Sequence, residues 1–138
     1  MKKLSLLLLV SFVCLSLSAQ ISKKEAVEKK IMSVEEWETD LETRKPKPIQ
    51  ESLTKYDPNG KLVEIIERDN VGEITLHEKY EFDAKGNKIS EIRFNASGVI
   101  KKKHVYTYDG NLRVLRKTYN SEGKLIAEKK YIYKFFDK

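Results

Sequence analysis

The chain has 138 residues, a formal net charge of +6 and 35% charged residues. This length suits one small domain rather than two. The charges of both signs are interspersed along the chain, without the concentrated basic patch of a nucleic-acid-binding protein, so the composition argues against nucleic acid as a partner.

Residues 1–19 have the three-part pattern of a signal peptide. A short cationic start is followed by an apolar run over residues 4–17 and by the small residues Ser18 and Ala19, after which a signal peptidase would cleave. The apolar run is too short to span a bilayer and has no stop-transfer flank. The sequence therefore predicts an exported protein, periplasmic or secreted, whose mature chain has no transmembrane span.

Cys14 is the single cysteine, and it lies inside the predicted signal peptide. The bulky Val13 stands where lipidation of the cysteine would require a small residue, so the sequence disfavours a lipoprotein. Removal of residues 1–19 would leave 25 basic and 21 acidic residues, a net charge of +4. It would also exclude a disulfide framework, a thiolate metal site and a cysteine nucleophile.

Residues 22–42 are predicted to be helical, as one helix or two short ones. Ser33 and Glu36 are spaced as a capping box, and an apolar stripe follows at helical spacing: Val34, Trp37 and Leu41. A helix this short is marginal in water, so we expect the stripe to cover part of a sheet. A flexible tether is the alternative.

A second, weaker start signal of the same kind lies upstream, at Ser22 and Glu25. Downstream, Pro46 and Pro48 end any helix, because each lacks an amide donor and pushes its predecessor toward extended geometry. The sequence thus predicts a helical segment with a proline-containing linker over residues 20–48 and a β-hairpin repeat domain over residues 49–138.

Six glycines recur in the second half at intervals of 12 to 14 residues: Gly60, Gly72, Gly86, Gly98, Gly110 and Gly123. Most of them close a short polar cluster that begins with Asp or Asn, as in tight turns. Strands are expected between these turns, near 49–56, 61–68, 73–82, 87–94, 99–108, 111–119 and 124–135. The pattern predicts a mainly β fold, an antiparallel up-and-down meander of about seven strands.

The early strands differ from the later ones in their patterning. Residues 62–63 and 65–66 are apolar at successive positions, so both faces are expected to be covered there, with the Trp37 helix on one side. The strand at 73–82 alternates apolar and polar residues, which indicates one solvated face.

Two segments, 80–87 and 106–111, resemble the aromatic-x-aromatic-Asp-x-x-Gly-Asn core of YD (RHS-type) repeats, and MORN-type hairpin repeats are similar in rhythm. The likeness covers residues 52–136, with a period near 25 residues. It implies a strand-rich, exported scaffold of bacterial type. It carries over no catalytic residues, because the signature positions of the repeat are turn and packing positions.

Catalytic and metal-binding patterns are missing from the sequence. His77 and His104 lack the spacing of metal ligands and are expected to be ordinary exposed sheet residues. Five glutamates with strand spacing are better explained by cross-strand ion pairs on a solvated face: Glu64, Glu67, Glu78, Glu91 and Glu128. The sequence predicts a non-enzymatic protein without cofactor or metal.

Two surfaces are candidates for binding. The long, apolar terminal strand would leave an open edge, which a protein partner or a second copy could extend through Tyr131, Tyr133 and Phe135. Alternatively, Lys101 and Lys103 could contact an anionic glycan or lipopolysaccharide while Tyr106 or Tyr108 stacks on a sugar ring.

The favoured hypothesis is therefore an exported, non-catalytic interaction module of the cell envelope or the extracellular space. Glycan binding is the second hypothesis, and a hydrolase is the third.

Overall fold

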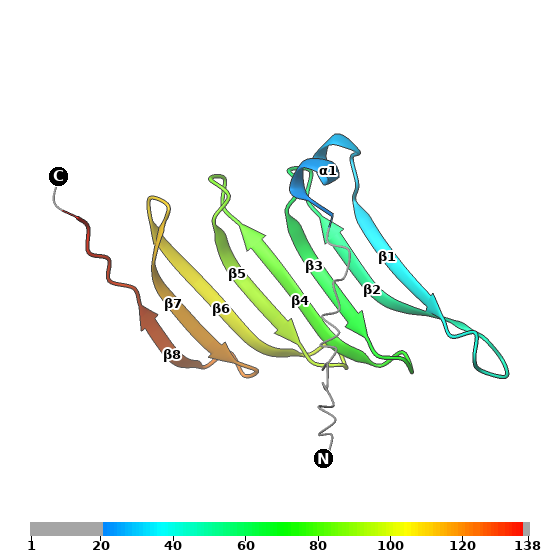
Figure 1. Cartoon of the computed structure of the whole chain (residues 1–138). Coiled ribbons are helices and arrows are strands. Elements are labelled where there is room, and N and C mark those ends of the chain that lie inside the picture. Colours follow the sequence, from blue (N-terminus) through cyan, green and yellow to red (C-terminus); the bar gives the residue numbers. More distant parts are fainter. Residues whose placement is uncertain (1–20, 137–138) are drawn as a thin grey trace, which may run out of the picture.

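The computed structural model of the chain describes residues 21–136, so the predicted signal peptide and Cys14 lie outside the described residues. One helix and eight strands follow in chain order: α1 (Lys23–Glu28), β1 (Ser33–Thr39), β2 (Pro48–Tyr56), β3 (Leu62–Arg68), β4 (Ile74–Phe82), β5 (Lys88–Phe94), β6 (Ile100–Asp109), β7 (Leu112–Asn120) and β8 (Leu125–Lys130). Each strand pairs antiparallel with the next, in one open sheet of order β1 to β8 (Figure 1). The up-and-down meander is confirmed, with eight strands rather than about seven.

Five hairpins are closed by one repeated turn. In the turn between β2 and β3, the Asp57 carboxylate accepts hydrogen bonds from the backbone amides of Asn59 and Lys61, at 2.9 and 2.8 Å. Gly60 adopts a φ of +73°, the left-handed conformation that favours glycine. A side-chain oxygen likewise accepts the amide four residues on at Asp69, Asp83, Asn95 and Asn120. The β6–β7 turn is shorter, with Asp109 directly opposite Leu112.

The helix predicted from Ser33 onward does not form, because residues 33–39 are strand β1 at the edge of the sheet. Pairing with β2 satisfies the backbone groups of this segment that point into the sheet, whereas a lone helix would have buried only a narrow stripe. Glu36 does not cap a helix; its carboxylate accepts a hydrogen bond from Ser52 on β2 at 2.5 Å. Trp37 lies on β1 and is 58% exposed, so it covers no strand.

The weaker start signal is the one that begins a helix. The Ser22 hydroxyl accepts a hydrogen bond from the Glu25 amide at 3.2 Å, and α1 follows. Ala26 is buried, and α1 packs on the β2–β3 turn so closely that a Cβ on Gly60 would lie 2.5 Å from the Lys23 carbonyl oxygen. The helix therefore sits over one end of the sheet, as Figure 1 shows, and leaves the strands themselves uncovered.

The terminal strand is shorter than the expected 124–135, because β8 ends at Lys130. Lys130 lies opposite Leu115, and β7 begins only three residues earlier, at Leu112. Beyond Tyr131, whose amide bonds the Val114 carbonyl at 3.1 Å, little of β7 remains to pair with. Residues 131–136 consequently leave the sheet as an irregular tail.

The sheet is a single layer over most of its extent. We expected both faces of the early strands to be covered, but among the described residues no further layer packs on them. Only three apolar residues are buried in the described part of the chain: Ala26, Ile65 and Tyr106. Long cationic side chains lie over aromatic rings instead, as Lys88 does over Tyr80 at 4.3 Å from the ring centroid. Aliphatic stems and cation–π contacts thus replace a hydrophobic core on both faces.

Candidate functional site

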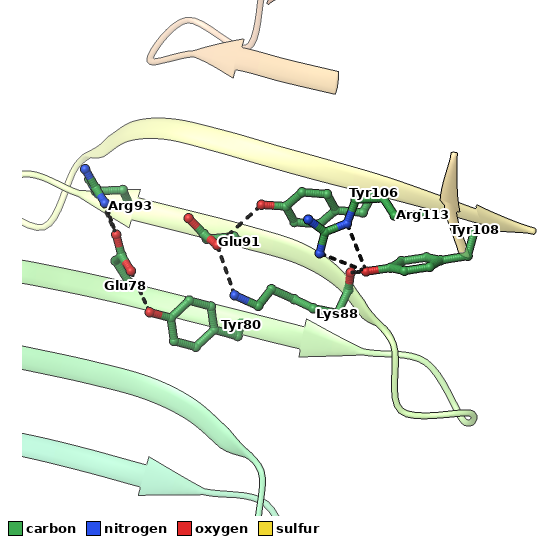
Figure 2. Close-up of polar contacts among 8 residues, drawn as sticks. All are labelled: Glu78, Tyr80, Lys88, Glu91, Arg93, Tyr106, Tyr108 and Arg113. Atoms are coloured by element: carbon green, nitrogen blue, oxygen red, sulfur yellow. Dashed lines mark hydrogen bonds and ion pairs between the residues drawn. The ribbon is translucent and has the colours of Figure 1, made fainter. Parts of the chain in front are cut away.

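Directly opposed residues of neighbouring strands share a face of the sheet. We call the face of the sheet that carries Tyr80 and Tyr106 the tyrosine face. On this face, Glu78 is buried between Tyr80 and Arg93 (Figure 2). The Tyr80 hydroxyl donates to Glu78 at 2.5 Å, and the Arg93 Nε donates to the other carboxylate oxygen at 2.6 Å. Burial by itself would raise the pKa of Glu78. These hydrogen bonds and the Arg93 charge lower that pKa by more than burial raises it, so the net shift is downward.

Arg113 on β7 organises the next part of the tyrosine face. Its guanidinium carbon lies 4.1 Å from the Tyr106 ring centroid, and it donates to the Tyr108 hydroxyl at 3.1 and 3.3 Å. Tyr108 in turn donates to the backbone carbonyl of Lys88 at 2.8 Å. Burial, together with the nearby Glu91 carboxylate, raises the pKa of Tyr106 to about 12. Tyr106 therefore acts as a neutral packing group at physiological pH.

The opposite face, here the Glu64 face, is built around a buried carboxylate. Glu64 is contacted by Lys55 at 2.7 Å, His77 at 2.9 Å and Lys79 at 3.4 Å. Burial would raise the pKa of Glu64, but hydrogen bonds from Lys55 and His77 and the Lys79 charge lower it to about 2.

Cross-strand ion pairs form at three of the five expected glutamates, Glu64, Glu78 and Glu128, and the carboxylates of Glu64 and Glu78 are buried rather than solvated. Glu91 instead pairs with Lys88 on its own strand, and Glu67 makes no ion pair with a described residue.

The two histidines are half-buried rather than exposed. The ring of His77 stacks on Phe94 with centroids 4.5 Å apart, in addition to its bond with Glu64. His104 shares a hydrogen bond of 2.9 Å with Thr118. No group of three or more potential metal-ligating His, Cys, Asp or Glu side chains occurs within residues 21–136.

The lysines and tyrosines of the glycan hypothesis are separated by the pleat of β6. Lys103 lies opposite Ile92 and Tyr119, on the Glu64 face, and Lys101 lies at the bulge near the start of the strand. Tyr106 lies on the tyrosine face, only 8% exposed and covered by Arg113. The described structure therefore does not bring Lys103 onto the same face as Tyr106 or Tyr108, the two tyrosines of the glycan hypothesis.

The three terminal residues of the edge hypothesis lie in the tail after β8. Tyr131 continues the ladder for one residue, and the Tyr133 hydroxyl donates to the Arg113 carbonyl at 2.7 Å. Phe135 is 76% exposed, and its apolar neighbours Ile132 and Phe136 are exposed too. The tail is thus attached to β7 by its tyrosines and leaves its other apolar side chains in solvent.

The β8 edge presents backbone groups that no described residue pairs with. Because the Tyr131 amide points inward to Val114, alternation along the strand points the Lys130 amide outward. All side chains of β8 are exposed, and four lysines lie along this edge and the tail: Lys124, Lys129, Lys130 and Lys134. Glu128 is the single acid in that stretch. This edge is therefore open and basic.

The β1 edge is open too, and it is acidic. The Tyr56 amide bonds the Met32 carbonyl, so alternation points the Glu35 amide outward, away from β2. Residues 33–42 contain five acids and no base. A hydrogen bond with Glu38, some loss of hydration and the charges of Glu38 and Glu36 raise the pKa of Glu51 on neighbouring β2, which reflects this density of carboxylates.

The sequence predicts the β8 edge but not the β1 edge, because the capping box at Ser33 and the helical spacing after it favour a helix over residues 33–39. The alternative signal was present: Val34 and Trp37 are β-branched and aromatic residues, which favour strands. Nothing in the segment itself could show that β2 would accept it as a partner, since that depends on the length and direction of the 40–47 loop.

A comparison with models of known protein families and with curated proteins gave no match. No helix among the described residues is long and apolar enough to cross a membrane. The function is therefore inferred from the geometry of the sheet.

Proposed function

We propose that this chain is an exported, non-catalytic interaction module that binds protein by strand addition to an open sheet edge. The observation that carries the proposal is the exposed, unpaired backbone of β8, followed by an apolar tail. Such an edge offers hydrogen bonds to any extended segment, and in most proteins it is blocked or covered.

Two further features support this function. The hairpin rhythm resembles that of YD repeats, which are exported scaffolds. In addition, the polar side chains on each face of the sheet bond to their neighbours on the same face rather than pointing into a common cleft. Glu78, Glu64 and Tyr106 each have their partners within the sheet. This arrangement stabilises a platform, whereas catalysis requires groups that converge on a substrate.

The test uses a proline at an outward-pointing amide. Lys130→Pro removes a backbone donor that faces away from β7, so it should block strand addition while leaving the internal ladder intact. Tagged wild-type chain and Lys130→Pro would be compared as baits in the envelope and culture-fluid fractions. The double variant Lys101→Glu/Lys103→Glu, which alters charge away from the edge, is the control.

The expected result is a protein retained by the wild type and by the control but lost by Lys130→Pro. Mass spectrometry of the exported chain should also show an N-terminus at Gln20. Retention of the same proteins by all three baits would contradict binding through the edge.

A further inference from the structure

The two edges of the sheet are complementary to each other in charge. The β1 segment, residues 33–42, carries five acids, whereas β8 and its tail carry four lysines and one acid over residues 124–134. Two β8 edges brought together would oppose lysines to lysines, and two β1 edges would oppose carboxylates to carboxylates. Opposed like charges on adjacent strands are destabilising. Charge therefore favours contact between unlike edges.

The direction of the strands also fits contact between unlike edges. Because the sheet has eight strands in strict alternation, β1 and β8 run in opposite directions. When β8 of one copy lies beside β1 of another copy in the same orientation, the new pair is antiparallel, like every other pair in the sheet. The meander then continues across the junction without a change in pattern.

We infer that the partner of the open edges is a second copy of this chain, with β8 of one copy lying antiparallel beside β1 of the next. This inference rests on the proposed function and names its partner. The contact joins two different surfaces, so each copy keeps one free edge and the assembly grows head to tail rather than closing as a dimer.

The backbone specifies one register for this junction. Lys130 and Glu35 both have outward-pointing amides, so they can oppose each other as a hydrogen-bonded pair. Lys130 lies opposite Leu115, and Glu35 lies opposite Leu53. Both leucines are on the Glu64 face, so Lys130 and Glu35 lie on that face too. In this register an ammonium group meets a carboxylate, and the two faces of the sheet remain continuous between copies.

The apolar tail then meets an apolar hollow. When the tail extends beside β1 in the same register, Tyr133 lies opposite Met32, at the end of the sheet where α1 lies (Figure 1). A hollow of about 630 Å³ opens there, lined mainly by apolar side chains that include Val27, Ile31 and Met32, of which Met32 is 81% exposed. Burial of Phe135 of one copy in this hollow of the next would remove apolar surface of both from water.

Charge reversal with complementation tests the inference in the full-length chain. Glu35→Lys/Glu38→Lys places two lysines on β1, and Lys129→Glu/Lys130→Glu places two further glutamates on β8, so that each variant alone opposes like charges at these positions and should associate about tenfold more weakly than the wild type. An equimolar mixture restores opposite charges at both junctions and should associate again. Lys101→Glu/Lys103→Glu is the matched control and should behave as the wild type. Sedimentation velocity gives the masses, and circular dichroism verifies that each variant is folded.

The outcomes separate this inference from the proposed function. Head-to-tail pairing is supported if the wild type associates into larger assemblies, each double variant associates more weakly, and the equimolar mixture associates again. A wild type that stays monomeric at high concentration, yet retains another protein that Lys130→Pro loses, overturns the second copy as partner while strand addition stands. Association that is unaffected by both charge reversals overturns the proposed junction.

Discussion

The guanidinium of Arg113 lies over the ring of Tyr106, with its central carbon 4.1 Å from the ring centroid, and hydrogen-bonds the Tyr108 hydroxyl. In a two-layer protein, a second sheet or a helix would cover that ring. Here one cationic side chain excludes water from the ring while its own charge stays hydrated at the edge. The same arrangement recurs with Lys61 over Phe82 and Lys88 over Tyr80.

Arg113 should therefore contribute to stability as a covering group. Arg113→Ala removes both the cation–π contact and the bonds to Tyr108, and it is expected to lower the free energy of unfolding by about 1–3 kcal/mol. Arg113→Lys keeps the charge but loses the planar fork, so its loss should be smaller. Urea denaturation monitored by far-ultraviolet circular dichroism measures both. Equal stability of Arg113→Ala and the wild type would show that the ring needs no cover.

The Glu64 cluster predicts a specific acid dependence. The pKa of Glu64 in the folded chain is about 2, below its ordinary value of 4.5, so its ionised form stabilises the fold above pH 4.5. That contribution should be lost progressively as the pH falls from 4.5 toward 2. Glu64→Gln should be less stable than the wild type at neutral pH, and the difference should shrink over this interval. The exposed Glu122→Gln serves as control, and a constant difference across the interval would contradict the assignment.

The contact between α1 and the β2–β3 turn can be isolated with two glycines of similar backbone conformation. Gly60 and Gly98 have φ values of +73° and +78°, but an added Cβ at Gly60 would clash with the Lys23 carbonyl. At Gly98 an added Cβ would meet no described atom within 4 Å beyond those of its chain neighbours. Gly98→Ala should cost about 1 kcal/mol from backbone strain alone. Gly60→Ala should cost about 1–3 kcal/mol more, because α1 must also move. Thermal or urea unfolding gives both values, and equal costs would mean that α1 is not packed there.

The sequence predicted the hairpins well because their determinants are local. A turn such as Asp57 to Lys61 needs one carboxylate and one left-handed glycine, and both lie within five residues of each other. The same holds for the strands between the turns, whose lengths the turns fix.

The ends of the sheet could not be predicted in the same way, because a strand at an edge is defined by its neighbour. Residues 33–39 have a capping box and helical spacing, yet pairing with β2 outweighs both. Conversely, Tyr131 to Phe136 has strong strand propensity, but β7 offers it no partner beyond its first residues. The sequence predicted the tail residues as candidate contacts. The burial of Tyr106 under Arg113 could not be predicted, because it depends on a contact between β6 and β7 that no local pattern encodes.

The register of the inferred junction makes a further prediction. With Lys130 opposite Glu35, Tyr131 of one copy lies opposite Val34 of the next as a non-hydrogen-bonded pair, whose close Cβ atoms suit a disulfide. In a Cys14→Ser background, Tyr131→Cys mixed with Val34→Cys should form a covalent dimer under mild oxidation, seen on non-reducing gels. Cross-linking of Tyr131→Cys with itself at the same rate would indicate a β8–β8 contact instead.

Amide hydrogen exchange at Glu35 and Lys130, measured by NMR at low and at high protein concentration, tests the central claim most directly. Both amides point away from the sheet, so they should exchange quickly in dilute solution and slowly once copies associate. The Tyr131 amide, which is bonded to Val114, should exchange more slowly than that of Lys130 in dilute solution. Slow exchange of Glu35 and Lys130 even at high dilution would mean that the edges are already covered within one chain, and fast exchange at every concentration would mean that no second copy covers them.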